Sequence, residues 1–423
     1  MYSSEKTYGG EINILNIVNK SISKILNVKS ILIVHPQFIQ IGGAETVALK
    51  IMKRIVETTD AHITILTLEK WSLSAIAKTT GISLSSERVS LVVAKYPNIL
   101  KNRTGRFYLL RIAYLHRQTK LLAKNFELCV STYNEIDFRK CGIQYVHHPT
   151  YAPVRSLKRY EMINDPIFFV LIKSIMEIPY NFMIWLISRN WRKGFSNNVT
   201  MVNSQFMADW LKELYRIPAE IVHPDAVSKI SLDHTIPWEE REFRFVTVGR
   251  ISPDKKTLEF IDICKAIISV YPSAKFAIVG RVSDVKYYEK VKNKIADLGV
   301  SVEFYHNLEN ETLMKMLIAS KFYIAPKKYE HFGISILEAV RAGCLTFVHN
   351  TGGQREIVIE EVLRYNSIQQ LLNNIAIVLE NTLLREQTLT VLKHHMQNFS
   401  SDNFNQGIDG ILRLWQKKSK IIG

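Results

Sequence analysis

The segment Glu330–Glu338 (EHFGISILE) carries two carboxylates in a setting that suits a phosphorylated ligand. It follows an apolar run ending at Ala325-Pro326 and opens a helix, so Glu330 should lie in the loop and Glu338 about two turns into the helix. Gly333 lets the backbone approach a ligand closely, and a helix start offers free N–H groups to a phosphate. A carboxylate on that helix can accept hydrogen bonds from ribose hydroxyls. The spacing alone fits two solvated glutamates equally well.

Basic residues follow another apolar run, in the sequence Gly249–Lys256 (GRISPDKK). Arg250 and Lys255 can converge on a diphosphate, because arginine offers a planar fork and lysine a compact charge. Such a pair would neutralise a departing diphosphate, which is the task of a metal ion in other enzymes. The alternative is an exposed strand-to-helix loop that happens to carry two basic side chains.

Two further turns are candidates for the same ligand. Gly42 and Gly43 precede a helix and can present N–H groups to a diphosphate. His147 and His148 (YVHHPT) end a predicted strand, and side chains at the carboxyl edge of a parallel sheet face the ligand cleft. A plain turn and a surface histidine are the alternatives. Because no Asp-x-Asp pair or His/Asp cluster has metal-ligand spacing, we expect no metal ion and no other cofactor.

Near-continuous apolar runs alternate with helical stretches, which predicts parallel α/β sheets. A first set of strands is expected at Ser30–His35, Ile63–Leu68, Val89–Ala94, Leu128–Thr132 and Ile143–His147. A second set is expected at Phe243–Val248, Lys275–Val279, Val302–Tyr305, Phe322–Ala325 and Leu345–His349. Helices are expected at Ala44–Val56, Leu258–Val270, Lys286–Leu298 and Asn405–Lys417.

These sets predict two Rossmann-like domains, residues 1–228 and 240–400. A linker near Asp225–Glu242 is indicated by Pro224, Pro237 and a cluster of charges. Residues 401–423 contain the last predicted helix, which we expect to pack back on the first domain.

The charge balance favours anionic partners. Lys and Arg number 55 against 39 Asp and Glu, a net charge of +16, which suits nucleotide phosphates, acidic lipid headgroups or nucleic acid. A content of 47% hydrophobic residues excludes a disordered chain. The four cysteines form no metal-binding spacing, and the N-terminus lacks a secretory signal, so we expect reduced thiols in a cytoplasmic protein.

Residues 166–187 (PIFFVLIKSIMEIPYNFMIWLI) form an unusually apolar segment. A helix in the membrane interface would place Trp185, Trp191 and Arg192 at the headgroups. A helix of the first domain's core is the second interpretation. A membrane-spanning helix is the third, and it would have to bury Lys173 and Glu177.

The joint order of these motifs resembles the retaining glycosyltransferases of family four. The resemblance rests on the Gly42-Gly43 loop, the cleft histidine, the GR-x4-K segment, EHFGISILE and Gly352-Gly353-x-x-Glu356. Within the family, the chain is most similar to the eukaryotic α-1,2-mannosyltransferases that extend the dolichol-linked oligosaccharide. This similarity lies in four segments: YVHHPT, Met201–Ser204, Ile221–Pro224 and EHFGISILE. The resemblance implies the GT-B fold, with two Rossmann-like domains whose parallel sheets face each other across a cleft.

The resemblance also implies roles for single residues. Glu330 would lie near the donor sugar and the reacting centre, and His147 would contact the transferred sugar. Arg250 and Lys255 would bind the diphosphate. The remaining donor-binding residues would be the ribose ligand Glu338, the base neighbour Leu308 in His306-Asn307-Leu308, and the backbones of Gly42, Gly43, Gly249, Phe332, Gly333 and Ile334. No metal is needed, and the anomeric configuration is kept.

Three positions depart from the family's usual pattern. Lys256 stands where a glycine often follows the lysine, His331 stands where a glycine often follows the first glutamate, and His148 replaces an aromatic residue. The mannosyltransferase relatives share the histidine at the second of these positions.

We therefore expect a metal-independent retaining hexosyltransferase on the cytosolic membrane face. GDP-mannose is the first expectation for the donor and a UDP-hexose the second, with a polyprenyl-linked glycan or a polysaccharide precursor as acceptor and no nucleic acid partner. A nicotinamide-dependent oxidoreductase would need G-x-G-x-x-G after the first strand, where this chain has HPQFIQIGGAE. A non-catalytic basic module leaves Glu330 and Glu338 unexplained.

Overall fold

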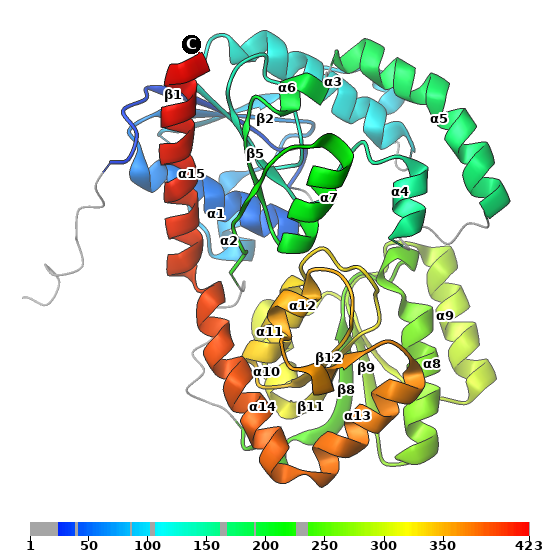
Figure 1. Cartoon of the computed structure of the whole chain (residues 1–423). Coiled ribbons are helices and arrows are strands. Elements are labelled where there is room, and N and C mark those ends of the chain that lie inside the picture. The colour runs from blue at the N-terminus through cyan, green and yellow to red at the C-terminus, as the bar shows by residue number, and fades with distance from the viewer. Residues whose placement is uncertain are drawn as a thin grey trace, which may run out of the picture.

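A computed structural model describes residues 24–38, 41–84, 87–101, 106–160, 167–189, 192–225 and 236–422. Residues 1–23 lie outside the described residues, as do Trp191 and most of the predicted linker, residues 226–235. The rest of the chain forms two α/β lobes, one above the other in Figure 1.

The first lobe is built on a seven-stranded parallel sheet with the order β3-β2-β1-β4-β5-β6-β7. Its strands are β1 (Ser30–Val34), β2 (His62–Thr67), β3 (Val89–Val93), β4 (Leu128–Ser131), β5 (Ile143–Val146), β6 (Val199–Val202) and β7 (Glu220–Ile221). The central strands are buried on both faces, which is why they read as unbroken apolar runs. The sequence predicted β1 to β5 to within a residue and missed β6 and β7.

The second lobe repeats this arrangement with six parallel strands in the order β10-β9-β8-β11-β12-β13. Its strands are β8 (Glu242–Val248), β9 (Lys275–Val279), β10 (Glu303–Tyr305), β11 (Ser320–Ala325), β12 (Leu345–His349) and β13 (Arg364–Tyr365). In both sheets the strand order reverses at the first strand, beside β4 in one and β11 in the other. Ligands bind at such switch points, outside the carboxyl ends of the strands.

Helices cover both sheets. The first lobe carries α1 (Gly43–Thr58), α2 (Leu73–Thr80), α3 (Arg106–Ala123), α4 (Val154–Arg159), α5 (Ile167–Ser188), α6 (Arg192–Phe195) and α7 (Gln205–Tyr215). The second carries α8 (Thr257–Val270), α9 (Val285–Leu298), α10 (Asn310–Ala319), α11 (Ile334–Arg341), α12 (Gln354–Ile357), α13 (Ile368–Glu380) and α14 (Thr382–His395). Short 3-10 turns lie at Asn98–Leu100, Trp238–Glu240, Pro253–Lys255, Glu361–Leu363 and Met396–Phe399.

The last helix, α15 (Ser401–Ile422), crosses from the second lobe to the first (Figure 1). Its apolar residues Phe404, Ile408 and Trp415 join the core under the first sheet, and the Trp415 indole donates to the Cys141 carbonyl at 3.1 Å. This strap buries an apolar stripe that would otherwise face water, and it joins the two lobes along one side.

Helix α5 runs along the outer side of the first lobe next to α3 (Figure 1). Ile184 is buried in a small cluster with Leu110 and Ala113 of α3, but the opposite face is open to solvent. The helix is therefore not a core element. Among the described residues, no helix combines the length and apolar character required to cross a membrane.

Candidate active site

A cavity opens at the switch point of the second sheet, at the carboxyl ends of β8 and β11. It is lined by Thr247, Val248, Gly249, Arg250, Lys255, Thr257, Ile278, Tyr323, Ala325, Pro326, Lys327, Glu330, Ser335 and Ile336. Arg250, Lys255 and Lys327 give it three cationic side chains against the single carboxylate of Glu330. Such a lining suits an anionic ligand.

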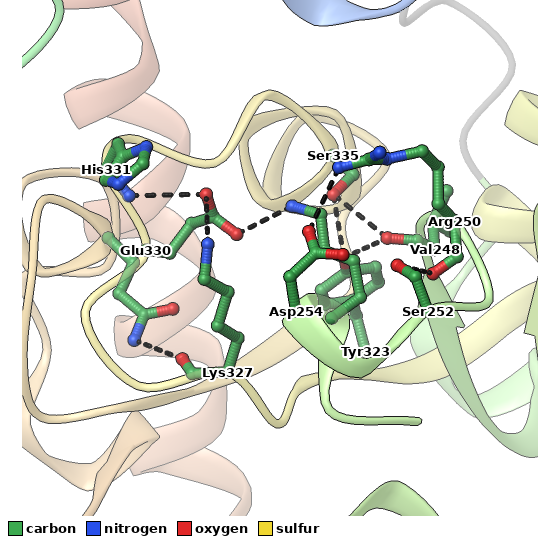
Figure 2. A network of polar contacts seen from close by, with 11 residues as sticks. Val248, Arg250, Ser252, Asp254, Tyr323, Lys327, Glu330, His331 and Ser335 are labelled. Atoms are coloured by element: carbon green, nitrogen blue, oxygen red, sulfur yellow. Dashed lines mark hydrogen bonds and ion pairs between the residues drawn. The ribbon is translucent and has the colours of Figure 1, made fainter. Parts of the chain in front are cut away.

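Glu330 accepts three hydrogen bonds from groups around this cavity. Lys255 Nζ lies 2.8 Å from one carboxylate oxygen, while Lys327 Nζ at 3.5 Å and the His331 N–H at 3.2 Å reach the other. Figure 2 shows Glu330 between Lys327 and His331. Burial opposes ionisation, but the charges of Lys255 and Lys327 prevail and hold the pKa of Glu330 well below its usual range. Glu330 is therefore a carboxylate near neutral pH.

Arg250 lies two residues after the end of β8 and does not contact Glu330 in this network. Its guanidinium donates to Asp254 at 3.0 Å, and half of the side chain is exposed. Burial opposes ionisation of Asp254, yet Arg250 and the Ser252 hydroxyl lower its pKa. Figure 2 shows this ion pair at the far side of the network from His331. Because both side chains are about half exposed, Arg250 can leave Asp254 and bind an anionic ligand without leaving a buried carboxylate unpaired.

Glycines allow the backbone of the Glu330 loop to pack tightly against the Gly352-Gly353 turn. Gly333 has φ +106 at the start of α11, and Gly352 has φ +72. A Cβ on Gly352 would lie 2.6 Å from the Glu330 carbonyl oxygen, and one on Gly353 would lie 2.0 Å from the His331 carbonyl oxygen. The Gly353 N–H donates to the Glu330 carbonyl at 2.8 Å. The Gly352-Gly353 turn therefore supports the loop that carries Glu330.

The start of α11 lies between the cavity and the first lobe. Tyr323 donates to the Ser335 hydroxyl at 3.0 Å, and Ser335 donates to the Val248 carbonyl at 3.3 Å, so this turn is bonded to β8 and β11. A Cβ on Gly43 would fall 2.7 Å from Ile334 Cδ1. The predicted glycine loop of the first lobe thus meets the predicted donor helix of the second. Neighbouring Gly42 donates its N–H to Glu45 at 2.9 Å.

His147 lies where β5 ends, as predicted. Its N–H donates to the Asn134 side-chain oxygen at 3.0 Å. Burial and the nearby His148 lower the pKa of His147 to about 3, so its ring is neutral. Within the described residues, the buried Nε2 atoms of His147 and His331 lack a hydrogen-bond partner. Buried polar atoms are rarely left unpaired, and a ligand hydroxyl would satisfy them.

Two of the three departures from the family pattern contact each other. The rings of His148 and His331 are stacked with centroids 5.9 Å apart and planes at 10°, one from each lobe. His331 also lies 6.0 Å from Trp210 of α7. The third departure, Lys256, has φ +58, the left-handed conformation in which glycine is the least strained residue.

Of the predicted donor-binding residues, Gly249 lines the cavity, and the others do not: Gly42, Gly43, Leu308, Phe332, Gly333, Ile334 and Glu338. Glu338 lies one turn into α11, which corrects the predicted two turns, because the helix begins at Ile334. It is 9% exposed, and burial raises its pKa to about 7 against the opposing charges of Lys50 and Arg341. Leu308 follows β10 and packs against the core of the second lobe. Phe332 is buried in that core too, so only its backbone is available to a ligand.

Sequence reasoning missed Lys327 and the contacts of Glu356. Lys327 lies two residues after the end of β11, and this place just beyond the carboxyl end of a strand was the available signal. Glu356 is on α12, and its carboxylate bonds residues of the first lobe. Only the assembled lobes could reveal these partners.

Residues 230–389 match the family model described as "Glycosyl transferases group 1". The second lobe is a group 1 glycosyltransferase domain. Its cationic cavity and the glycine-supported Glu330 loop lie inside the matched residues.

Curated relatives match about half of the chain. The chain is 27% identical over 235 residues to the Xenopus laevis "GDP-Man:Man(3)GlcNAc(2)-PP-Dol alpha-1,2-mannosyltransferase", covering 51% of this chain and 48% of that protein. It is 26% identical over 215 residues to the Escherichia coli "UDP-Gal:alpha-D-GlcNAc-diphosphoundecaprenol alpha-1,3-galactosyltransferase", covering 46% and 53%. The chain thus spans about half the length of the curated relatives it matches.

Solved structures share nearly the whole architecture. Anabaena Alr3699/HepE in complex with UDP and glucose aligns with a TM-score of 0.61 at 17% identity, over 89% of this chain and 97% of that one. WaaG, a glycosyltransferase involved in lipopolysaccharide biosynthesis, aligns with a TM-score of 0.57 at 15% identity, over 93% and 99%. The fold is GT-B, as predicted.

Proposed function

We propose that this chain transfers a hexose, mannose from GDP-mannose in the first instance, to a lipid-linked oligosaccharide or polysaccharide precursor. The observation that carries the proposal is the cavity in which Arg250, Lys255 and Lys327 surround Glu330 at the switch point of the group 1 domain. The mannosyltransferase names of several relatives support the donor and the acceptor.

The cavity fits the departure of a nucleoside diphosphate. The negative charge on the leaving phosphate grows in the transition state, and Arg250 and Lys255 are cations that can move onto it from Asp254 and Glu330. The same cations support metal independence, because they supply the charge that a divalent ion supplies elsewhere. Glu330 would then face the sugar from its loop.

The state of Glu330 supports retention of configuration by front-side attack. A carboxylate whose pKa is held well below its usual range is a weak general base. In the proposed reaction the acceptor hydroxyl attacks the anomeric carbon on the face that the diphosphate leaves. The C–O bond to phosphate breaks as the new glycosidic bond forms, and the hydroxyl proton passes to the leaving phosphate oxygen.

His147 would contact the transferred sugar from the first lobe. Its neutral ring has an unpaired buried Nε2, and the Nε2 of His331 is in the same state on the opposite lobe. Neutral imidazoles can either accept from or donate to sugar hydroxyls.

A UDP-hexose is the second candidate donor. It is favoured by the galactosyltransferase relative of Escherichia coli and by the fold neighbour bound to UDP and glucose. The two donors present the same diphosphate and differ in the base and the hexose.

We also propose that the chain is peripheral on the cytosolic membrane face through α5. Seven apolar side chains are exposed along one side of this helix: Ile172, Ile175, Met176, Ile178, Phe182, Met183 and Leu186. Spacings of three and four residues place most of them on one stripe. Arg189 lies over the Trp185 ring at 5.5 Å, a pairing suited to the headgroup layer. A polyprenyl-linked acceptor would be reached from the same surface.

The test is calorimetric binding of GDP, UDP and ADP, each with EDTA present, to the wild type and to Glu338→Gln. Micromolar binding of one nucleotide that the substitution weakens and EDTA leaves unchanged is expected. Product analysis with the matching nucleotide sugar and a polyprenyl-diphosphate-linked acceptor then defines the hexose and the anomer. A folded protein that binds none of the three nucleotides would contradict the proposal.

A further inference from the structure

The carboxylate of Glu356 bonds the start of a helix in the other lobe. Gln205 and Phe206 are the first two residues of α7, and their N–H groups donate to the two Glu356 oxygens at 3.0 and 3.3 Å. The first N–H groups of a helix have no acceptor within the helix, and an anion is favoured at its positive end. Glu356 therefore caps α7 from a position 151 residues away in the sequence.

The same carboxylate holds a second segment of the first lobe. Nε2 of His223, in the loop after β7, lies 2.9 Å from the Glu356 oxygen that also accepts from Gln205. The His223 ring is stacked on Phe332 at 5.7 Å, and Phe332 is two residues beyond Glu330. The contact thus couples two segments of the first lobe to the Glu330 loop.

The backbone around Glu356 leads directly to Glu330. Gly352 and Gly353 are the two residues immediately before α12. This turn supports the Glu330 loop through the 2.8 Å hydrogen bond from the Gly353 N–H to the Glu330 carbonyl. Ser204, the N-cap of α7, donates its hydroxyl to the His331 carbonyl at 2.5 Å. The start of α7 is therefore bonded to the Glu330 loop directly, through His331, and also to Glu356, which follows the turn that supports this loop.

We propose that Glu356 is a positioning residue that fixes the first lobe, by way of α7, against the loop that carries Glu330. Both oxygens of the Glu356 carboxylate are engaged by the Gln205 and Phe206 N–H groups and by His223, and the residue does not line the donor cavity, so we assign it a role in geometry and not in contact with the nucleotide. The inference rests on the proposed function, since it concerns how both lobes meet the reacting sugar. A small displacement of a reacting group can lower turnover by up to about 100-fold.

Two substitutions test each side of this contact. Glu356→Gln keeps the shape but leaves one acceptor oxygen for three donors. Gln205→Pro removes one N–H donor from the first helical position, where proline is tolerated, and the extended Ser204 (φ −162, ψ 160) suits a residue before proline. Gln205→Ala keeps the N–H and is the matched control for the proline. Glu380→Gln, at the exposed end of α13, is the control for loss of a glutamate charge.

Two measurements are combined. Glu356→Gln and Gln205→Pro should lower kcat by about 10- to 100-fold, while the nucleotide Kd changes less than about twofold. In Glu356→Gln, the amide hydrogens of Gln205 and Phe206 should exchange with solvent faster than in the wild type. Both controls should retain wild-type turnover.

Unchanged exchange in Glu356→Gln, or faster exchange with wild-type turnover, would overturn the inference. So would a loss of nucleotide affinity as large as the loss of turnover. The exchange measurement needs no substrate, so it distinguishes failure of this inference from failure of the proposed function, in which the wild type itself would neither bind nucleotide nor transfer a hexose.

Discussion

Lys255 Nζ donates to Glu330 at 2.8 Å and so joins the loop after β8 to the loop after β11. These loops flank the switch point of the second sheet, where its strand order reverses. Both side chains are partly buried, so the attraction between them is screened less than at an open surface. The pair keeps a cation in place where a diphosphate would bind and keeps Glu330 ionised before the donor arrives.

Replacing Lys255 by alanine should lower turnover more than donor affinity. The charge on the leaving phosphate grows as the glycosidic bond breaks, so the lost cation matters more in the transition state than in the bound donor. We expect kcat to fall by about 100-fold or more, as when one oxyanion donor is removed, with a smaller change in nucleotide Kd. Steady-state kinetics and calorimetry measure the two quantities.

The control for this substitution is Lys315→Ala, which removes an exposed lysine of α10 whose ammonium group forms an ion pair with Glu311 at 2.6 Å. It should leave kcat unchanged. Full turnover in Lys255→Ala would remove Lys255 from the reaction.

The order of motifs predicted the fold and the places of several candidate residues, because strand ends and loop residues are local features. Buried parallel strands appear as apolar runs, so His147, Arg250 and Glu330 could each be assigned to the segment that follows a strand, and Gly43 to the turn at the start of the first helix. The sequence missed β6, β7 and β13, and two of these have only two residues, too few for a recognisable pattern.

Contacts between the lobes were beyond reach. The stacking of His148 on His331 and the capping of α7 by Glu356 join segments more than 100 residues apart, and no periodicity records such pairs. The sequence identified His148 and His331 separately as departures. Their contact offers a common physical reason, because each ring supplies the other with a flat neighbour at the interface.

Arg250→Ala should also lower kcat more than donor affinity, and Arg250→Lys should restore only part of the loss. Arginine can bind two phosphate oxygens with its planar fork, whereas lysine supplies a single point charge. Stability should change little, because Arg250 is half exposed and its partner Asp254 is too. The kinetics of both variants measure the effect, with Arg413→Ala on the exposed side of α15 as the control. Equal rates for Arg250→Lys and the wild type would contradict a role for the fork.

Glu338→Gln should stabilise the protein at alkaline pH. Burial raises the pKa of Glu338 from 4.5 to about 7, so ionisation disfavours the folded state as the pH rises between these values. The wild type and the variant should be similar near pH 4.5. Above pH 7 the variant should gain about 3 kcal/mol in the free energy of unfolding, at about 1.4 kcal/mol per pKa unit.

Urea denaturation at pH 5 and pH 8 measures this difference. A gain at pH 5 that matches the gain at pH 8 would contradict ionisation of Glu338 as its cause. Weaker nucleotide binding alongside higher stability would fit a residue kept for ligand recognition at a cost in stability.

The exposed face of α5 should bind anionic membranes. The wild type is expected to sediment with liposomes rich in phosphatidylglycerol at low salt and to be released in part at high salt, because surface attraction is screened within about 10 Å at 0.1 M salt. Ile175→Asp combined with Phe182→Asp should abolish sedimentation, since these side chains are 68% and 60% exposed on the apolar stripe.

Nucleotide binding should stay at the wild-type level, because α5 is part of the first lobe and the cavity lies in the second. Val285→Asp replaces an equally exposed apolar residue on α9 and should sediment like the wild type. If the double variant sediments as well as the wild type, another surface carries the interaction, and if the wild type stays in solution at both salt concentrations, α5 does not attach this chain to a membrane.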